Sequence, residues 1–171
     1  GPPPAPALKQ VWRYDTLTDS YARVADLPSE RASGGLTIDK NHRLHYIGGL
    51  KDRDNDSSDH WFLDLTQSNA EWVSAADLPR KRNHFPAFAI QDYIYVTGGQ
   101  FKHDSVPVDT ALSSAYSISD NTWRELSNMP APRTHVEPAN IVANGRVILF
   151  GGRNNQGPGP VILSTIVEYN P

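Results

Sequence analysis

The chain has 171 residues, with 16 Lys and Arg against 19 Asp and Glu, a formal net charge of −3, and no cysteine. The absence of cysteine excludes disulfides, thiolate nucleophiles and cysteine-ligated metal sites in this segment, and the charge provides no cationic excess for binding nucleic acid. The apolar runs are far shorter than the roughly 20 residues of a membrane helix, so we expect neither a nucleic-acid partner nor a membrane span.

The first segment of the chain, residues 1–9, is rich in proline and alanine and starts with Gly1-Pro2. Such a stretch favours an extended conformation and cannot contribute to a sheet ladder. We therefore expect a linker or trimmed terminus of something longer, or a cloning remnant, followed by a folded segment at 10–171.

Four kinds of marker recur along the chain with a period of about 51 residues. They are an aromatic residue, a Leu-Pro or Met-Pro pair, an arginine and a double glycine: Tyr21, Trp72 and Trp123; Leu27-Pro28, Leu78-Pro79 and Met129-Pro130; Arg31, Arg82 and Arg133; Gly48-Gly49, Gly98-Gly99 and Gly151-Gly152. The first three kinds are spaced by 51 and 51 residues, and the glycine pairs by 50 and 53. Because four independent markers keep one register, the chain is an internal repeat.

The local pattern inside each repeat predicts short strands rich in β-branched and aromatic residues. In chain order we expect strands at 11–15, 21–24, 36–38, 44–47, 61–65, 71–73, 87–90, 93–96, 115–118, 121–124, 140–142, 146–150 and 165–169. Hairpin turns separate the first two strands of each repeat, most plainly at Asn144-Gly145.

Four short antiparallel strands with double-glycine and tryptophan markers describe a propeller blade. With these markers the chain resembles the kelch family, whose pattern can be followed from Tyr116 to Arg133 and over roughly residues 11–171. The resemblance implies an all-β, kelch-type β-propeller with four-stranded antiparallel blades, of which about three are present. We expect the glycines to lie where blades converge without room for a Cβ atom, and the aromatic marker to fill the space between blades.

The register of the repeat divides the folded segment into blades. We expect the third and fourth strands of one blade at 11–24, complete blades at 33–74 and 85–125, and a partial blade at 136–171. Since propellers close with roughly 4 to 8 blades, we expect a piece of a larger propeller whose closure needs remaining segments or a second chain.

Long polar loops between the second and third strands, together with the crossings from one blade to the next, should emerge on one face, where binding is expected. The crossings repeat Arg-x-His as Arg82 with His84 and Arg133 with His135, and Arg31 precedes them by one repeat. This ring could hold a carboxylate or sulfate. The alternative is that the arginines only tie neighbouring blades together.

The long loops contain further candidates. Asp52, Asp56 and His60 resemble the Glu-x-x-x-Asp-x-x-x-His iron site of kelch-type specifier proteins, except that aspartate stands at the first position; a solvated loop without metal is the competing interpretation. Asn55 begins an Asn-Asp-Ser glycosylation motif.

A second loop offers Phe101 and His103, which suit a sugar site if Phe101 is not packed against its own blade.

These features predict a binding module for a protein or glycan, without cofactor and without assigned catalytic residues. The alternative is a carbohydrate-active enzyme of the galactose oxidase-like extracellular kelch group, completed by blades outside this segment. That group's copper site includes a Tyr–Cys crosslink, which this chain cannot supply. A mutarotase or lyase would be tested at His84, His135 and Glu137. We expect a secreted or cell-surface protein, with the cytoplasm as alternative.

Overall fold

The computed structural model describes residues 7–52, 54–156 and 159–170, and all its regular elements in these ranges are β-strands. Most of the expected linker, residues 1–6, lies outside them. Leu8 and Lys9, at its end, already accept backbone hydrogen bonds from Arg31 and Leu27. In the described part of the chain, no helix has the length and apolar character needed to cross a membrane.

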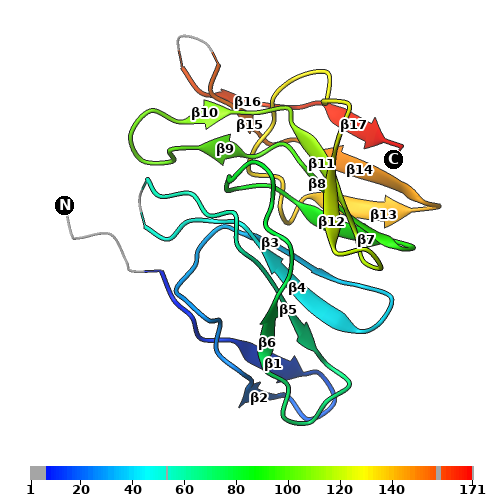
Figure 1. Cartoon of the computed structure of the whole chain (residues 1–171). Coiled ribbons are helices and arrows are strands. Elements are labelled where there is room, and N and C mark those ends of the chain that lie inside the picture. The colour runs from blue at the N-terminus through cyan, green and yellow to red at the C-terminus, as the bar shows by residue number, and fades with distance from the viewer. Residues whose placement is uncertain (1–6, 53, 157–158, 171) are drawn as a thin grey trace.

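The strands form successive antiparallel sheets arranged as a fan (Figure 1). The first sheet pairs β1 (Trp12–Asp15) with β2 (Ser20–Arg23). The second has the order β3 (Gly35–Ile38), β4 (Arg43–Ile47), β5 (His60–Asp64) and β6 (Trp72–Ser74). The third has the order β7 (Ala87–Ile90), β8 (Tyr93–Thr97), β11 (Ser113–Ser117) and β12 (Thr122–Leu126). The last has β13 (Asn140–Ala143), β14 (Arg146–Phe150) and β17 (Ile166–Tyr169).

These sheets confirm the all-β fold of four-stranded antiparallel blades in a partial propeller. Two short hairpins were not expected from the sequence. They are β9 (Gln100–Phe101) with β10 (Val108–Asp109), and β15 (Arg153–Asn154) with β16 (Val161–Ile162). Each hairpin lies within a long loop between the second and third strands of a blade, so these loops are partly ordered as sheet.

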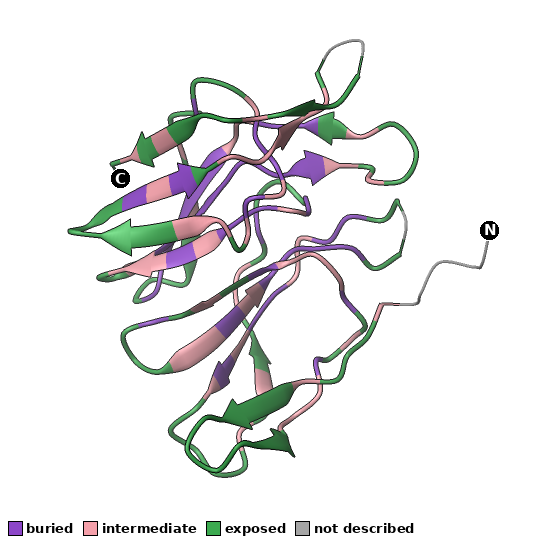
Figure 2. Ribbon diagram, turned by 180° about the vertical axis from the view of Figure 1, so that it is seen from behind, coloured by how far each residue is buried: buried purple, intermediate pink, exposed green. Residues whose placement is uncertain are grey.

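The hydrophobic core lies between the sheets rather than inside any one of them, since a single sheet has no interior. One cluster is shared by the second and third sheets: Ile47, Leu78, Phe85, Ile94, Val96, Tyr116 and Ile118. The other is shared by the third and last sheets: Phe88, Tyr95, Ala115, Met129, Val147 and Leu149. Figure 2 accordingly shows buried residues along the middle strands and an exposed first sheet. Each blade is therefore stabilised by its neighbours.

Five of the six marker glycines occupy positions without room for a side chain, as expected, and Gly151 is less crowded, with the nearest atom 3.3 Å from a Cβ built there. Gly98 has a φ of +69°, and a Cβ atom there would lie 2.3 Å from the carbonyl oxygen of Arg133. At Gly49 the same atom would lie 2.5 Å from the carbonyl oxygen of Ala32. Because both contacts are with backbone, a side chain could enter only if a crossing moved away, that of the next repeat at Gly98 and that of the same repeat at Gly49.

The tryptophan markers contact the preceding sheet, so the expected location between blades is confirmed. The indole Nε1 of Trp72 donates to the carbonyl of Ala25, 2.9 Å away, just after β2. Trp123 donates to Ala76, 2.8 Å away, just after β6. Both bonds span 47 residues, so the same link is made one repeat later. Their N-terminal counterpart, Tyr21, is 70% exposed.

Candidate functional site

The crossings between sheets and the long loops meet at one end of the fan, as the sequence predicts. We call this end the loop face; it comprises the described residues of loops 48–59, 98–112 and 151–165 and of crossings 24–34, 75–86 and 127–139. Isolated antiparallel bridges join each crossing to the loop of its own repeat, namely Ala32 to Leu50, Asn83 to Gln100 and Thr134 to Arg153. At the opposite end, the described connections within the sheets are two to seven residues long.

Two buried aspartates hold neighbouring loops of this face together. The carboxylate of Asp56 accepts hydrogen bonds from the Asn83 side chain and from the backbone N–H of Lys102, the latter at 3.1 Å. One repeat later, Asp109 accepts from both the backbone and the side chain of Asn155. Hydrogen bonds between a carboxylate and an N–H are stronger than neutral ones. The loops are therefore positioned before any ligand arrives.

Arg82 is fully buried and lies between two repeats. Its Nε donates to the carbonyl of Gly98 at 3.0 Å, while its own carbonyl accepts from the N–H of Gly49 at 3.0 Å. Burial lowers its pKa to about 10. This is the blade-tying geometry considered from the sequence.

Arg133 repeats the arrangement one blade later. Its guanidinium donates to the carbonyl of Gly151 and to Thr165 Oγ1, and its carbonyl accepts from the N–H of Gly99 at 2.8 Å. Burial lowers the pKa of Arg133. The guanidinium donates to groups of its own blade, while its carbonyl joins the preceding blade.

Arg31 makes a different set of contacts. Its guanidinium forms an ion pair with Asp59 and lies 4.7 Å from the centre of the Trp61 ring. Nη1 donates to the carbonyl of Glu30 at 2.6 Å. The donors of the three arginines described above bond to groups of the protein, whereas Arg31 Nε and Arg82 Nη2 are buried without a hydrogen-bond partner among the described residues.

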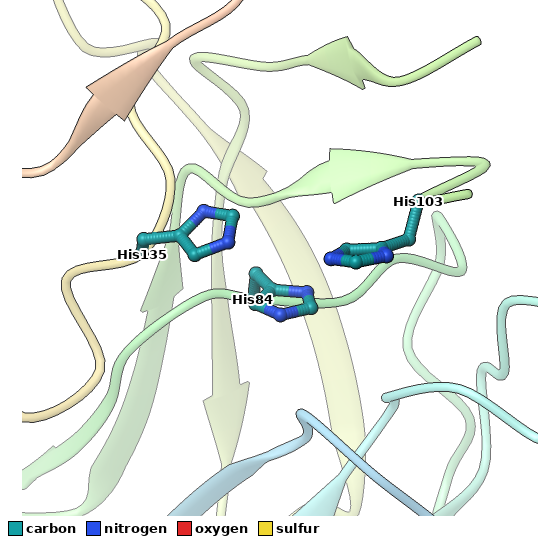
Figure 3. A group of neighbouring side chains, drawn as sticks. All are labelled: His84, His103 and His135. Carbon is teal, nitrogen blue, oxygen red and sulfur yellow. The ribbon is translucent and has the colours of Figure 1, made fainter. Parts of the chain in front are cut away.

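Three histidines, His84, His103 and His135, come together on the loop face (Figure 3); we call them the histidine cluster. His84 stacks against both partners, with ring centroids 4.3 Å from His135 and 4.5 Å from His103. His84 and His135 have φ angles of 52° and 57°, close to the 54° of Ser33 one repeat earlier. The crossings thus share one backbone shape, which presents these side chains at the same place in each repeat.

His103 was a separate candidate in the sequence, and only the fold relates it to the other two. It follows β9 in a loop whose length varies between repeats, so no periodicity links it to His84 or His135. The hairpin formed by β9 and β10 returns it over the crossings.

Burial and neighbouring positive charges favour the neutral forms of His84 and His135. Burial lowers the pKa of His84 to about 3, and His135 and His103 add to the effect because their positive charges would repel its own. Burial also lowers the pKa of His135, with Arg153 contributing. The imidazoles of His84 and His135 therefore present lone pairs rather than positive charge.

The remaining loop candidates are dispersed. Phe101 is half-buried and pairs with Val108 across the β9–β10 hairpin. Glu137 is partly buried, and burial raises its carboxyl pKa. Asn55, the glycosylation candidate, is exposed and donates from Nδ2 to the carboxylate of Asp52 at 2.7 and 2.8 Å.

The Asp52, Asp56 and His60 side chains are not brought together. Asp52 is exposed and bonded to Asn55, whereas Asp56 takes part in the loop contact described above. His60 is fully buried between sheets, with Nε2 2.8 Å from His45 Nδ1. The spacing of four residues suggested that Asp52, Asp56 and His60 could share a ligand. In the structure, strand β5 begins at His60 and directs the His60 ring into the core, away from the two aspartates.

The buried pair of His45 and His60 was missed by the sequence analysis. His45 Nε2 lies 3.2 Å from Asp39 Oδ2, and His60 Nδ1 lies 3.2 Å from the carbonyl of Ala76. The alternation of β4 and β5 could have indicated that both rings face inward, but not that they face each other.

This pair predicts a loss of stability in acid. Burial, together with His45, lowers the pKa of His60 from 6.5 to about 3. Below pH 6.5 His60 is protonated in the unfolded chain, but in the folded chain it stays neutral until about pH 3. The free energy of unfolding therefore falls as the pH is lowered from 6.5 to about 3. We expect His60 to contribute up to about 1.4 kcal/mol per pH unit to the fall in unfolding free energy.

Urea unfolding at about pH 7 and about pH 5 measures this effect. In His60→Gln the fall between the two pH values should be smaller than in the wild type. An equal fall in both proteins would contradict the assignment to His60.

Comparison with known proteins identifies the repeat. Residues 81–130 match the kelch motif family. This segment therefore carries a kelch motif, and the chain is similar to kelch-repeat proteins over most of its length. It is 28% identical over 167 residues to kelch repeat and BTB domain-containing protein 1 of cowpox virus (strain GRI-90 / Grishak), covering 95% of this chain and 27% of that protein. It is 26% identical over 165 residues to mouse Kelch-like protein 35, and this match covers 96% of this chain and 26% of that protein. The kelch chain thus spans about a quarter of the length of these relatives.

A solved structure supports the same fold. The structure of YjhT superimposes with a TM-score of 0.67 at 22% identity, covering 77% of this chain and 37% of that one. The expectation of the kelch fold is confirmed. The narrower expectation of a galactose oxidase-like extracellular member is not supported by these kelch–BTB and Kelch-like relatives.

Proposed function

We propose that this kelch segment binds a protein partner through its loop face. The observation that carries the proposal is the pair of buried aspartate contacts, Asp56 to Lys102 and Asp109 to Asn155, which position adjacent loops in advance. Pre-organised loops bind with less loss of conformational entropy, and loops on a rigid scaffold are the usual location of recognition.

Apolar side chains at the two hairpins supply a contact surface. Val106 is 70% exposed and Ile162 is 79% exposed, and the contact between Asp109 and Asn155 joins their hairpins. Isolated exposed apolar residues are ordinary, but a group on positioned loops favours a protein interface. The relatives' kelch–BTB and Kelch-like names agree with a role as the kelch part of a larger protein.

The proposal is tested by comparing two variants in quantitative affinity purification from cells that express the protein. Val106→Glu combined with Ile162→Glu places charge on the loop face. Leu65→Glu is the matched control, because Leu65 is 46% exposed and its N–H bonds to His42 at the opposite end. Proteins bound by the wild type should be retained by the control and reduced at least about tenfold by the loop-face variant, a loss of about 1.4 kcal/mol or more.

Capture that survives the loop-face variant, or that is lost in the control, would contradict the proposal. Saturable binding on a glycan array, abolished by the loop-face variant, would replace a protein partner with a glycan. Turnover of an arrayed sugar would favour the enzyme alternative.

We also propose that further propeller segments or a second chain cover the two outer sheets. The apolar residues of the last sheet include Ile141 at 51% exposed and Ile166 at 64% exposed, and Trp12 of the first sheet is 54% exposed. Where the second, third and last sheets pack against one another, the facing apolar residues are buried. For the compartment we propose the cytoplasmic alternative, since the kelch–BTB and Kelch-like relatives favour it over the extracellular group.

A further inference from the structure

We propose that His84, His103 and His135 bind one divalent transition-metal ion, of the zinc, cobalt, nickel or copper class. The site is additional to the proposed protein interface and does not depend on it. Neutral imidazole nitrogens are preferred ligands of these metals and poor ligands of calcium or magnesium.

The ligand atoms are already close to a binding geometry. One ring nitrogen from each histidine lies within 4.8 Å of the others. Zinc–nitrogen bonds of about 2.0–2.1 Å place tetrahedral ligands roughly 3.4 Å apart, so the rings must approach by about 1.4 Å. All three side chains are only partly buried, so a metal ion could reach them from solvent. In Figure 3 the outer nitrogens of His103 and His135 face each other across the gap beside His84.

Neighbouring groups hold the Nδ1 atom of each ring and so leave Nε2 as the metal-binding atom. His103 Nδ1 lies 2.7 Å from the Asp104 carboxylate, which can only accept. His135 Nδ1 lies 3.2 Å from Thr134 Oγ1, whose own proton goes to the carbonyl of His84. Both Nδ1 atoms must therefore donate.

The same reasoning applies to His84. Its Nδ1 lies 2.5 Å from Asn83 Oδ1, and the Asn83 amide is oriented because its Nδ2 donates to buried Asp56. The oxygen of Asn83 thus faces His84 and takes the Nδ1 proton; the amide nitrogen of Gln100, also near Nδ1, is farther away at 3.3 Å. An acceptor behind each ring is the usual support of metal-binding histidines.

Charge near the cluster is mixed. Arg153 opposes a bound cation, although its Nε is held by Asn155 Oδ1 at 2.7 Å. The carboxylate of Asp104, which is hydrogen-bonded to His103, favours a bound cation. Three protein ligands leave a tetrahedral ion one open position.

The test is titration of the untagged 171-residue protein with zinc chloride in a calorimeter, repeated with cobalt to detect the intense visible absorption of tetrahedral coordination. We expect one equivalent bound. His103→Ala, and separately His135→Ser, should weaken binding at least about tenfold, and Asp104→Asn about 10- to 100-fold. Serine is chosen at 135 because Ser33 already occupies the equivalent position with the same φ.

The control is His42→Asn, at an exposed turn position on the opposite end whose φ of 61° asparagine tolerates. It should bind zinc as the wild type does. Thermal unfolding of each variant without metal confirms folding. No saturable binding by the wild type, or affinity unchanged in the folded His103→Ala and His135→Ser variants, would overturn the proposal.

Discussion

Gly98→Ala is expected to lower the free energy of unfolding by at least about 4 kcal/mol, which is exceptional for one methyl group. Its φ of +69° already disfavours any side chain by about 1–2 kcal/mol. The added Cβ would also lie 2.3 Å from the carbonyl oxygen of Arg133. That carbonyl accepts the N–H of Gly99, so relief would break the contact between two repeats. Urea unfolding measures the loss.

Gly145→Ala is the matched control. Gly145 has a φ of +73°, nearly the same as Gly98, but its Cβ would have nothing within 4 Å. It should therefore show the conformational cost alone, about 1–2 kcal/mol. Equal losses at the two glycines would mean that the crowding between repeats does not contribute.

Trp123→Ala should destabilise the protein by roughly 3–5 kcal/mol. The ring packs against the cluster between the second and third sheets, 5.3 Å from Tyr116 by ring centroids, and donates to Ala76 at 2.8 Å. Its removal opens a gap at the contact between two blades. Because each blade is stabilised by its neighbours, the loss should be felt by both.

Trp123→Phe separates packing from hydrogen bonding. A phenyl ring retains most of the packing but cannot donate, so a smaller loss of about 1–2 kcal/mol is expected. Thermal and urea unfolding of both variants provide the comparison. A change near zero in Trp123→Ala would show that the ring does not join the blades.

Several features of the fold were predictable because they depend on neighbours along the chain. The Asn144-Gly145 turn has φ angles of 51° and 73° at its two residues, as the dipeptide indicates. The β-branched and aromatic residues of β4 and β8 predicted these strands, and the glycine pairs predicted their ends. The role of Trp123 followed from its repeat position, since an element that recurs must meet the same neighbour each time.

Other features depended on which loops meet. Arg82 could be assigned either to a ligand or to its neighbours, and only the structure places its Nε on Gly98. The β9–β10 and β15–β16 hairpins escaped prediction because their strands are two residues long. The contact between His45 and His60 joins two strands through side chains whose packing no local pattern specifies.

The amino-acid sequence by itself determined the repeat of about 51 residues, the kelch blade and the absence of cysteine chemistry. The repeat follows from the spacing of its four markers, the kelch blade from the resemblance that those markers and the predicted strands carry, and the absence of cysteine chemistry from composition. Only the tertiary structure decided which chemical groups share a site. His84 and His135 repeat in register, but His103 reaches them only because sheets pack side by side and bring a loop of irregular length over the crossings.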